Sequence, residues 1–191
     1  MNFWLGFSRA IDATNRRVGL AVAWLVLLMT LVSAANAISR KAFSVSSNAF
    51  LEIQWYLFAA VFLLAAGYTL LENEHVRVDL LNTRWSERTR LKVELFGTVC
   101  FLGPLTALML WYGWPYFATS FASGEVSLQA GGLILWPAKL LIPVGFLLLF
   151  LQGLSQAIKL IAALAGRVPG APLIDRHAAA QRESSGDGST A

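Results

Sequence analysis

The sequence predicts an all-α membrane protein with four transmembrane helices, and three observations carry this prediction. Of the 191 residues, 57% are apolar or aromatic and only 14% are charged, which is about half the charged share of a soluble domain. Four long apolar runs divide the chain, each close to the roughly 20 residues that a helix needs to cross a bilayer. The single cysteine, Cys100, excludes a disulfide-stabilised scaffold.

Residues 1–17 are expected to form an amphipathic helix that lies on the inner leaflet before the first span. Apolar and polar side chains alternate there at helical spacing, which is typical of an interfacial helix. The apolar positions are Phe3, Trp4, Phe7 and Ile11, and the polar positions are Arg9, Asp12 and Arg16.

The four spans are expected over residues 18–38, 50–71, 95–117 and 133–154, within a transmembrane domain over residues 18–166. The first span has an alternative interpretation as a secretory signal peptide, because Arg16 and Arg17 precede it and the small-x-small triplet at 35–37 resembles a cleavage site. Its uncharged run is longer than a typical signal core, and three more spans follow. Both facts favour an uncleaved first helix.

The connection between the second and third spans is the most polar ordered stretch. His75, Arg77 and Asp79 alternate with apolar residues, which indicates an extended segment with one buried face. A cytoplasmic helix is then expected to begin near Thr83 or Ser86, since both residue types are good N-caps. Basic residues at helical spacing follow, and we expect them to contact lipid headgroups. They are Arg84, Arg88 and Lys92.

The basic residues predict that both termini are cytoplasmic. Twelve Lys and Arg residues fall on the side that holds the termini and the central loop, and two, Arg40 and Lys41, fall on the other. Such an excess marks the cytoplasmic side of a membrane protein. The segment 167–191, which is rich in Ala, Ser and Gly, is expected to be a disordered cytoplasmic tail.

Two charges lie within the predicted spans, Glu52 and Lys139. Charges inside a membrane are candidates for a functional role. Their depths differ by roughly 6 Å at 1.5 Å per residue, a gap that a lysine side chain can cross. We therefore hypothesise a Glu52–Lys139 pair joining the second and fourth spans. In the alternative, Glu52 sits in the hydrated interface and Lys139 extends outward to the membrane surface.

No catalytic, cofactor or metal site is expected. The two histidines, His75 and His177, lie outside the spans, so the bundle lacks the axial ligands that a haem-bearing anchor needs. Phosphate-binding and zinc motifs are absent from the sequence, and the basic balance lacks the patterning of a nucleic-acid-binding protein. Prolines in the third and fourth spans, Pro104 and Pro143, are expected to bend their helices.

Polar side chains are scarce in the middle of the predicted membrane. The exceptions suit hydrogen bonds between helices. They are Ser33, Asn36, Thr106 and Gln152. Because transporter substrate sites usually lie near the middle of the bilayer, this composition favours a supporting subunit over a transporter that acts alone.

Two blocks of sequence resemble the small membrane subunit of TRAP (tripartite ATP-independent periplasmic) transporters, the DctQ-like family. The first block is EIQWYLF at 52–58 followed by EHVRVD at 74–79. The second is GGL at 131–133 leading into WPAKLLIPVG at 136–145. The resemblance extends over about residues 5–165 and agrees with the four-span frame.

The resemblance implies a scaffold and partner for a large membrane permease subunit, in a sodium-coupled uptake system for an organic acid or related solute. A periplasmic solute-binding receptor would deliver the solute, and the large subunit would hold the solute site. The positions expected to serve architecture and partner contact are Glu52, Gln54, Trp55, His75, Arg77, Asp79, Trp136, Pro137, Lys139 and Pro143. The alternatives are the small subunit of a tricarboxylate-type tripartite transporter and, in a different class, a membrane anchor of a respiratory enzyme.

Overall fold

The computed structural model describes residues 2–43, 48–72, 86–129 and 132–167. These residues are almost entirely helical, with one isolated antiparallel bridge between Val126 and Ile134. The elements are α1 (Asn2–Phe43), α2 (Asn48–Glu72), α4 (Glu87–Gly97), the π-helical turn η1 (Thr98–Leu102), α5 (Gly103–Ser123) and α6 (Trp136–Leu164). Because α4, η1 and α5 follow one another without a break, they form one long helical rod.

Four helical stretches are long and apolar enough to cross a membrane, which confirms the prediction of four spans. Two of them are much longer than a bilayer requires. Helix α1 has 42 residues, and the rod Glu87–Ser123 has 37. At 1.5 Å per residue they measure about 63 and about 56 Å, against a hydrocarbon core of about 30 Å. Both therefore extend well beyond the core.

The predicted amphipathic helix over 1–17 is not a separate element, because α1 runs without interruption through its junction with the first span. No proline lies at the junction near Arg17, and Gly19 stays within the helix, packed against Tyr68 of α2. On the polar face Asp12 packs against α6, whereas on the apolar face Phe3 has 77% of its surface exposed.

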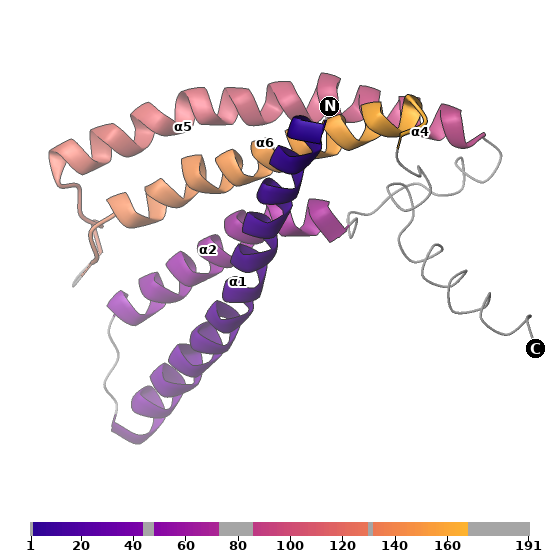
Figure 1. Cartoon of the computed structure of the whole chain (residues 1–191). Helices are drawn as coiled ribbons and strands as arrows, with labels where there is room; N and C mark the ends of the chain where they lie inside the picture. Colours follow the sequence, from indigo (N-terminus) through magenta and orange to yellow (C-terminus); the bar gives the residue numbers. More distant parts are fainter. Residues whose placement is uncertain (1, 44–47, 73–85, 130–131, 168–191) are drawn as a thin grey trace, which may run out of the picture.

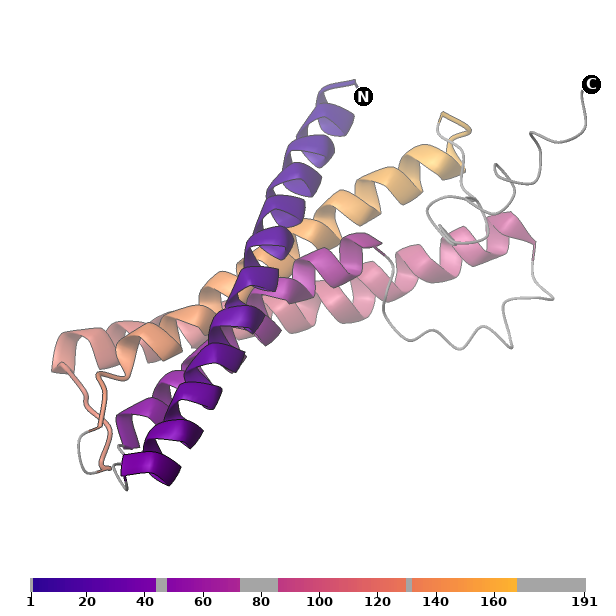
Figure 2. The same cartoon turned by 90° about the horizontal axis from the view of Figure 1, so that it is seen from below.

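The helices form two antiparallel hairpins (Figure 1). Helices α1 and α2 make one hairpin and the rod with α6 makes the other; α2 packs against α6, and the N-terminal part of α1 crosses α6. The hairpins spread apart toward the connection between α1 and α2 (Figures 1 and 2). Helix α6 is therefore the central element, since α1, α2, α4 and α5 all contact it.

The third span begins at Ser86, one of the two positions predicted for the helix start. The hydroxyl of Ser86 accepts a hydrogen bond from the amide of Thr89 at 3.3 Å, as an N-cap does. The expected loop helix is continuous with the span rather than separate from it. The other candidate start, Thr83, lies outside the described residues, as do residues 75–80 and the tail from 168 to 191.

The proline in the third span coincides with a change of helix type. Pro104 has no amide hydrogen to donate to the carbonyl four residues earlier. In the residues just before it the chain widens into the π-helical turn η1, in which the amide of Gly103 bonds to the carbonyl of Thr98. Such single π turns insert one extra residue into an α-helix. The structure thus shows a π-helical turn before Pro104, and the bend stays a prediction.

Few large apolar side chains are buried between the helices. Leu91 of α4 and Leu160 of α6 form a small cluster at the end of the second hairpin. Many larger residues face outward instead, among them Trp24 of α1 with 73% of its surface exposed and Trp111 of α5 with 77%. Lipid or another membrane protein must cover such surfaces, since a water-soluble chain would not expose them so densely.

Candidate functional site

The loop between α5 and α6 is fastened to α2 by the carboxylate of Glu52. One oxygen of Glu52 accepts a hydrogen bond from the Ser127 hydroxyl, and the other accepts one from the amide of Leu133 at 2.7 Å. Glu52 is only 6% exposed. A buried carboxylate needs such partners to offset its lost hydration. Glu52 therefore joins the two hairpins where they spread apart.

The loop itself is organised as a short hairpin. The amide of Ser127 bonds to the carbonyl of Leu133 and the amide of Leu135 to that of Glu125, both at 2.9 Å. Tyr56, one helical turn after Glu52, donates its hydroxyl to the carbonyl of Ile134 at 3.2 Å. Figure 2 shows that the loop extends from the ends of α5 and α6 toward the beginning of α2. The loop thus fills the space between the hairpins.

Lys139 pairs with Glu125 and not with Glu52, so the hypothesised Glu52–Lys139 pair is wrong. The ammonium also lies 4.3 Å from the ring centroid of Tyr116, in a cation–π contact. The hydrogen bond from Lys139 holds the pKa of the Glu125 carboxyl below its usual value of 4.5. The alternative placement fails for Glu52, because its carboxylate is buried. Sequence spacing missed Glu125 as the partner of Lys139, and Ser127 and Leu133 as the partners of Glu52, because all three lie in the loop.

Aromatic rings close the same end of the α5–α6 hairpin. Trp136 lies edge-on to Phe121, with ring centroids 5.4 Å apart, and also contacts Phe117 at 6.4 Å. Pro137 occupies the first turn of α6, where its missing amide hydrogen costs nothing. On α2, Trp55 is 68% exposed and Gln54 is half-buried, and their expected role in architecture and partner contact stays a prediction.

A second buried polar cluster joins α1 to α6, away from the α5–α6 loop. The carboxylate of Asp12 accepts hydrogen bonds from the Ser155 hydroxyl at 2.8 Å and from the Gln152 amide at 3.0 Å, and it pairs with Lys159. Asn15 donates to Gln152 at 2.9 Å. This confirms that Gln152 bonds between helices. Thr106, which was expected to do the same, donates instead to carbonyls of its own helix.

Small residues let the backbones approach closely at three points in the bundle. A methyl group on Gly145 of α6 would lie 2.8 Å from the carbonyl oxygen of Leu63 in α2, and one on Gly67 would lie 2.3 Å from Asn15. A methyl group on Gly113 of α5 would lie 3.7 Å from Pro143 of α6, an ordinary contact, and 3.3 Å from Ile142, a tight one. Pro143, a predicted structural residue, is therefore buried in the α5–α6 contact.

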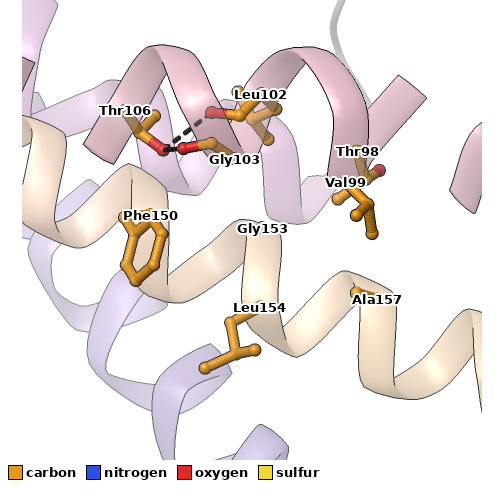
Figure 3. A pocket seen from close by; sticks show the side chains of 9 residues that line it. All are labelled: Thr98, Val99, Leu102, Gly103, Thr106, Phe150, Gly153, Leu154 and Ala157. Atoms are coloured by element: carbon orange, nitrogen blue, oxygen red, sulfur yellow. Dashed lines mark hydrogen bonds between the residues drawn. The ribbon is translucent and has the colours of Figure 1, made fainter. Parts of the chain in front are cut away.

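An apolar cavity of about 150 Å³ lies between η1 and α6 (Figure 3). Phe150, Leu154 and Ala157 line it on α6, and the rod contributes Val99 and Leu102. The hydroxyl of Thr106 is turned to the carbonyls of Leu102 and Gly103, at 2.7 and 3.0 Å. The hydroxyl of Thr106 is therefore hydrogen-bonded within its own helix, and the surface of the cavity is apolar.

Phe150 also lines a larger open groove, of about 640 Å³, farther along α5. The rest of its lining comes from α5 and includes Trp111, Trp114 and Pro115. Pro115 cannot donate to the carbonyl of Trp111, so that carbonyl lacks its usual helical partner. Rigid aromatic walls beside a proline are a composition suited to packing against another protein.

The structure leaves several predicted positions untested. His75, Arg77, Asp79 and Arg84 lie outside the described residues. Arg88 and Lys92 lie within α4, and both are exposed. Across the described residues, no group of three or more His, Cys, Asp or Glu side chains is arranged to hold a metal ion.

Comparison with known protein families gives one match. The family of the DctQ component of tripartite ATP-independent periplasmic transporters matches residues 29–163, more than half of the chain. The chain belongs to the DctQ family. No curated protein and no solved structure matches it. DctQ proteins are the small membrane subunits of TRAP transporters, and four helices able to span a membrane agree with that membership.

Part of this DctQ protein's polar architecture lies outside the residues that the sequence singled out. Ser8, Asn15, Ser155 and Ser127 are small polar residues, which are common in membrane helices and loops and give no signal by themselves. The spacing of Gln152, Ser155 and Lys159 did carry a signal, because positions three and four apart share one helix face. Opposite them, Ser8, Asp12 and Asn15 repeat the same spacing on α1.

Proposed function

We propose that this DctQ protein is the fixed scaffold of a sodium-coupled TRAP transporter that takes up an organic acid or related solute. The large membrane subunit would hold the solute and sodium sites, and a periplasmic receptor would deliver the solute. The small subunit would not bind the solute. Its role would be to give the large subunit a rigid surface in the membrane.

The observation that carries this proposal is that polar fasteners hold the two hairpins together at both ends. Glu52 connects α2 to the α5–α6 loop, and Asp12 connects α1 to α6. A buried hydrogen-bonded carboxylate resists displacement, because separating it from its partners leaves an unpaired charge. The second fastener includes Asn15, which lies against Gly67 of α2. Along α2, Gly67 lies 15 residues after Glu52, or about 22 Å away. Relative motion of the hairpins is thus opposed across most of the bilayer.

The exposed side of α5 is the surface we propose for the large subunit. Among the described helices α5 packs mainly on α6, and its outward residues include Trp111, Tyr112 and Trp114, each more than 60% exposed. No residue between Gly103 and Ser123 is charged. Aromatic residues dominate the binding energy of many protein interfaces, and the groove beside Trp111 would receive a transmembrane helix of the partner.

The proposed orientation has both termini in the cytoplasm of a bacterium and the Glu52 fastener on the periplasmic side. It is supported by the twelve-to-two distribution of basic residues. In this orientation the loop at 124–135 faces the compartment of the receptor. Arg88 and Lys92, which are exposed on α4, would lie where anionic headgroups of the inner leaflet can reach them, as would Arg84.

Deleting the small subunit tests the proposed role directly. Uptake by whole cells should fall to background, while the purified receptor still binds its solute and the large subunit is still present in the membrane. Restoring the small subunit should restore sodium-dependent uptake. Full uptake by the large subunit and receptor alone would contradict the scaffold role.

Cysteine cross-linking tests the proposed surface. In a Cys100→Ser background, Trp111→Cys and Trp114→Cys should cross-link to cysteines introduced into the large subunit. Trp24→Cys, an equally exposed position on α1, is the matched control and should not. Cross-links from Trp24 alone would move the interface to α1 and leave the scaffold role intact.

A further inference from the structure

The inner end of the contact between α1 and α6 holds an apolar groove that the scaffold role does not use. Beyond the contact between the Ser8 and Ser155 hydroxyls, 2.7 Å apart, the two helix ends diverge, as Figure 2 shows. The groove between them has a volume of about 220 Å³. Its lining is Trp4 and Leu5 of α1 with Ile158, Ile161 and Ala162 of α6.

Basic side chains flank this groove. Arg9 lies one helical turn after Leu5 and is exposed. Arg167 is also exposed, and its backbone amide bonds to the carbonyl of Ala162 at 3.0 Å, which fixes it beside the groove lining. Within the described residues neither arginine forms an ion pair, whereas the nearby carboxylate of Asp12 is already paired with Lys159. The mouth of the groove therefore carries uncompensated positive charge.

The groove combines an apolar interior with a positive rim. We infer that it binds an anionic phospholipid of the inner leaflet, with an acyl chain against Trp4 and Ile161 and the phosphate held by Arg9 and Arg167. Guanidinium groups pair well with phosphate oxygens. A free phosphate would leave the apolar lining uncovered, and an uncharged lipid would leave both arginines unpaired. Trp4, 52% exposed, has the amphipathic ring that prefers the interface between lipid and water.

This site goes beyond the proposed scaffold role. It depends on the proposed orientation, because the inner leaflet must face the groove, but not on sodium coupling or on the solute. Its failure can therefore be distinguished from failure of the scaffold role, which is read from uptake and from assembly with the large subunit.

The test uses the full-length protein, alone and with its large subunit. Each is reconstituted into vesicles of phosphatidylcholine that contain about 10% of the anionic lipid phosphatidylglycerol. After extraction into mild detergent, the retained lipids are counted by native mass spectrometry. The wild type should retain phosphatidylglycerol in preference to phosphatidylcholine. The double variant Arg9→Gln/Arg167→Gln should retain at least about tenfold less phosphatidylglycerol, since each basic group near the surface contributes to this attraction.

The matched control is Arg40→Gln/Lys41→Gln, which removes the same charge from the exposed opposite end of α1 and should leave retention by the groove unchanged. Ile161→Ser, at a half-exposed position that tolerates change, should weaken retention of the lipid while preserving the arginines. Equal loss from both double variants would overturn the site, as would equal retention of the two lipids. Displacement by inorganic phosphate alone would reassign the arginines to a free anion and also overturn it.

Discussion

At the scale of single residues, Glu52 is the side chain on which the most structure depends. It was expected to matter because a charge in a span is costly, and the structure gives the reason that it is tolerated: both oxygens accept hydrogen bonds from the loop. Its role is to hold a loop, which no periodicity in the sequence expresses.

Replacing Glu52 with Ala should destabilise the protein by about 2 kcal/mol, because the amide of Leu133 and the hydroxyl of Ser127 would lose their acceptor. Glu52→Gln should cost less, since the amide oxygen can still accept one of the two bonds. Thermal unfolding in detergent measures both effects. The exposed neighbour Leu51→Ala is the control, and an equal loss from it would contradict a specific role for the carboxylate.

The Glu125–Lys139 pair should make the loop sensitive to acid. Because the pair lowers the pKa of Glu125 below 4.5, its stabilisation is complete above that value and is lost as the pH falls through the lowered pKa of the folded state. The difference in Tm between wild type and Glu125→Gln should therefore be constant from pH 7 down to about 5 and vanish at lower pH. A difference that grows in acid would contradict this sign.

At the scale of helices, the number and type of the elements could be predicted well from the sequence, but the lengths of the helices could not. Four apolar runs of about 20 residues suffice to identify spans, and Ser86 is a cap that the sequence marks. The extension of α1 through residues 2–17 could not be predicted, because interfacial and continuous helices share the same periodicity. What decides between them is the contact of Asp12 and Asn15 with α6, and that contact is between residues far apart in the chain.

Close helix contacts make individual glycines indispensable. Gly145→Ala should destabilise the protein by about 1–3 kcal/mol, since its methyl group would lie 2.8 Å from the Leu63 carbonyl oxygen and the helices would have to separate. Gly97→Ala is the matched control, because nothing lies within 4 Å of the added atom. It should be neutral or stabilising by up to about 1 kcal/mol, as alanine favours helix. Equal losses of Tm from both would show that close packing is not the cause.

At the scale of the whole molecule, the two fasteners are separate units that act on the same pair of hairpins. The sequence could not reveal this arrangement, because each fastener joins residues more than 70 positions apart. One residue of each fastener was predicted from the sequence. Glu52 was noticed as an isolated charge in a span, and Gln152 as one of the few polar residues in the middle of the predicted membrane. The spreading of the hairpins, and the loop that fills the space, became apparent only in three dimensions.

A double-mutant analysis distinguishes coupled from independent fasteners. Lys159→Met should cost about 3 kcal/mol, because it leaves the carboxylate of Asp12 without its charge partner, and adding Asp12→Asn should restore part of that loss. Combined with Glu52→Ala, the effects of Lys159→Met should add within about 0.5 kcal/mol, since the sites share no partner. Urea unfolding in detergent measures these differences. Strong coupling between the two ends would contradict their independence.

The π-helical turn also constrains how the gene for this protein can change. It holds one residue more than a regular helix would, and each residue turns an α-helix by about 100°. Losing a single codon between Thr98 and Leu102 would convert the rod to an unbroken α-helix and leave α4 in nearly the same rotation relative to α5. Losing one in the α-helical parts between Leu91 and the contacts of α5 would instead rotate α4 by about 100°. Leu91 would then leave Leu160, its partner in the cluster. Over evolution, loss of one residue should therefore be tolerated within Thr98–Leu102 and selected against in the α-helical parts of the rod.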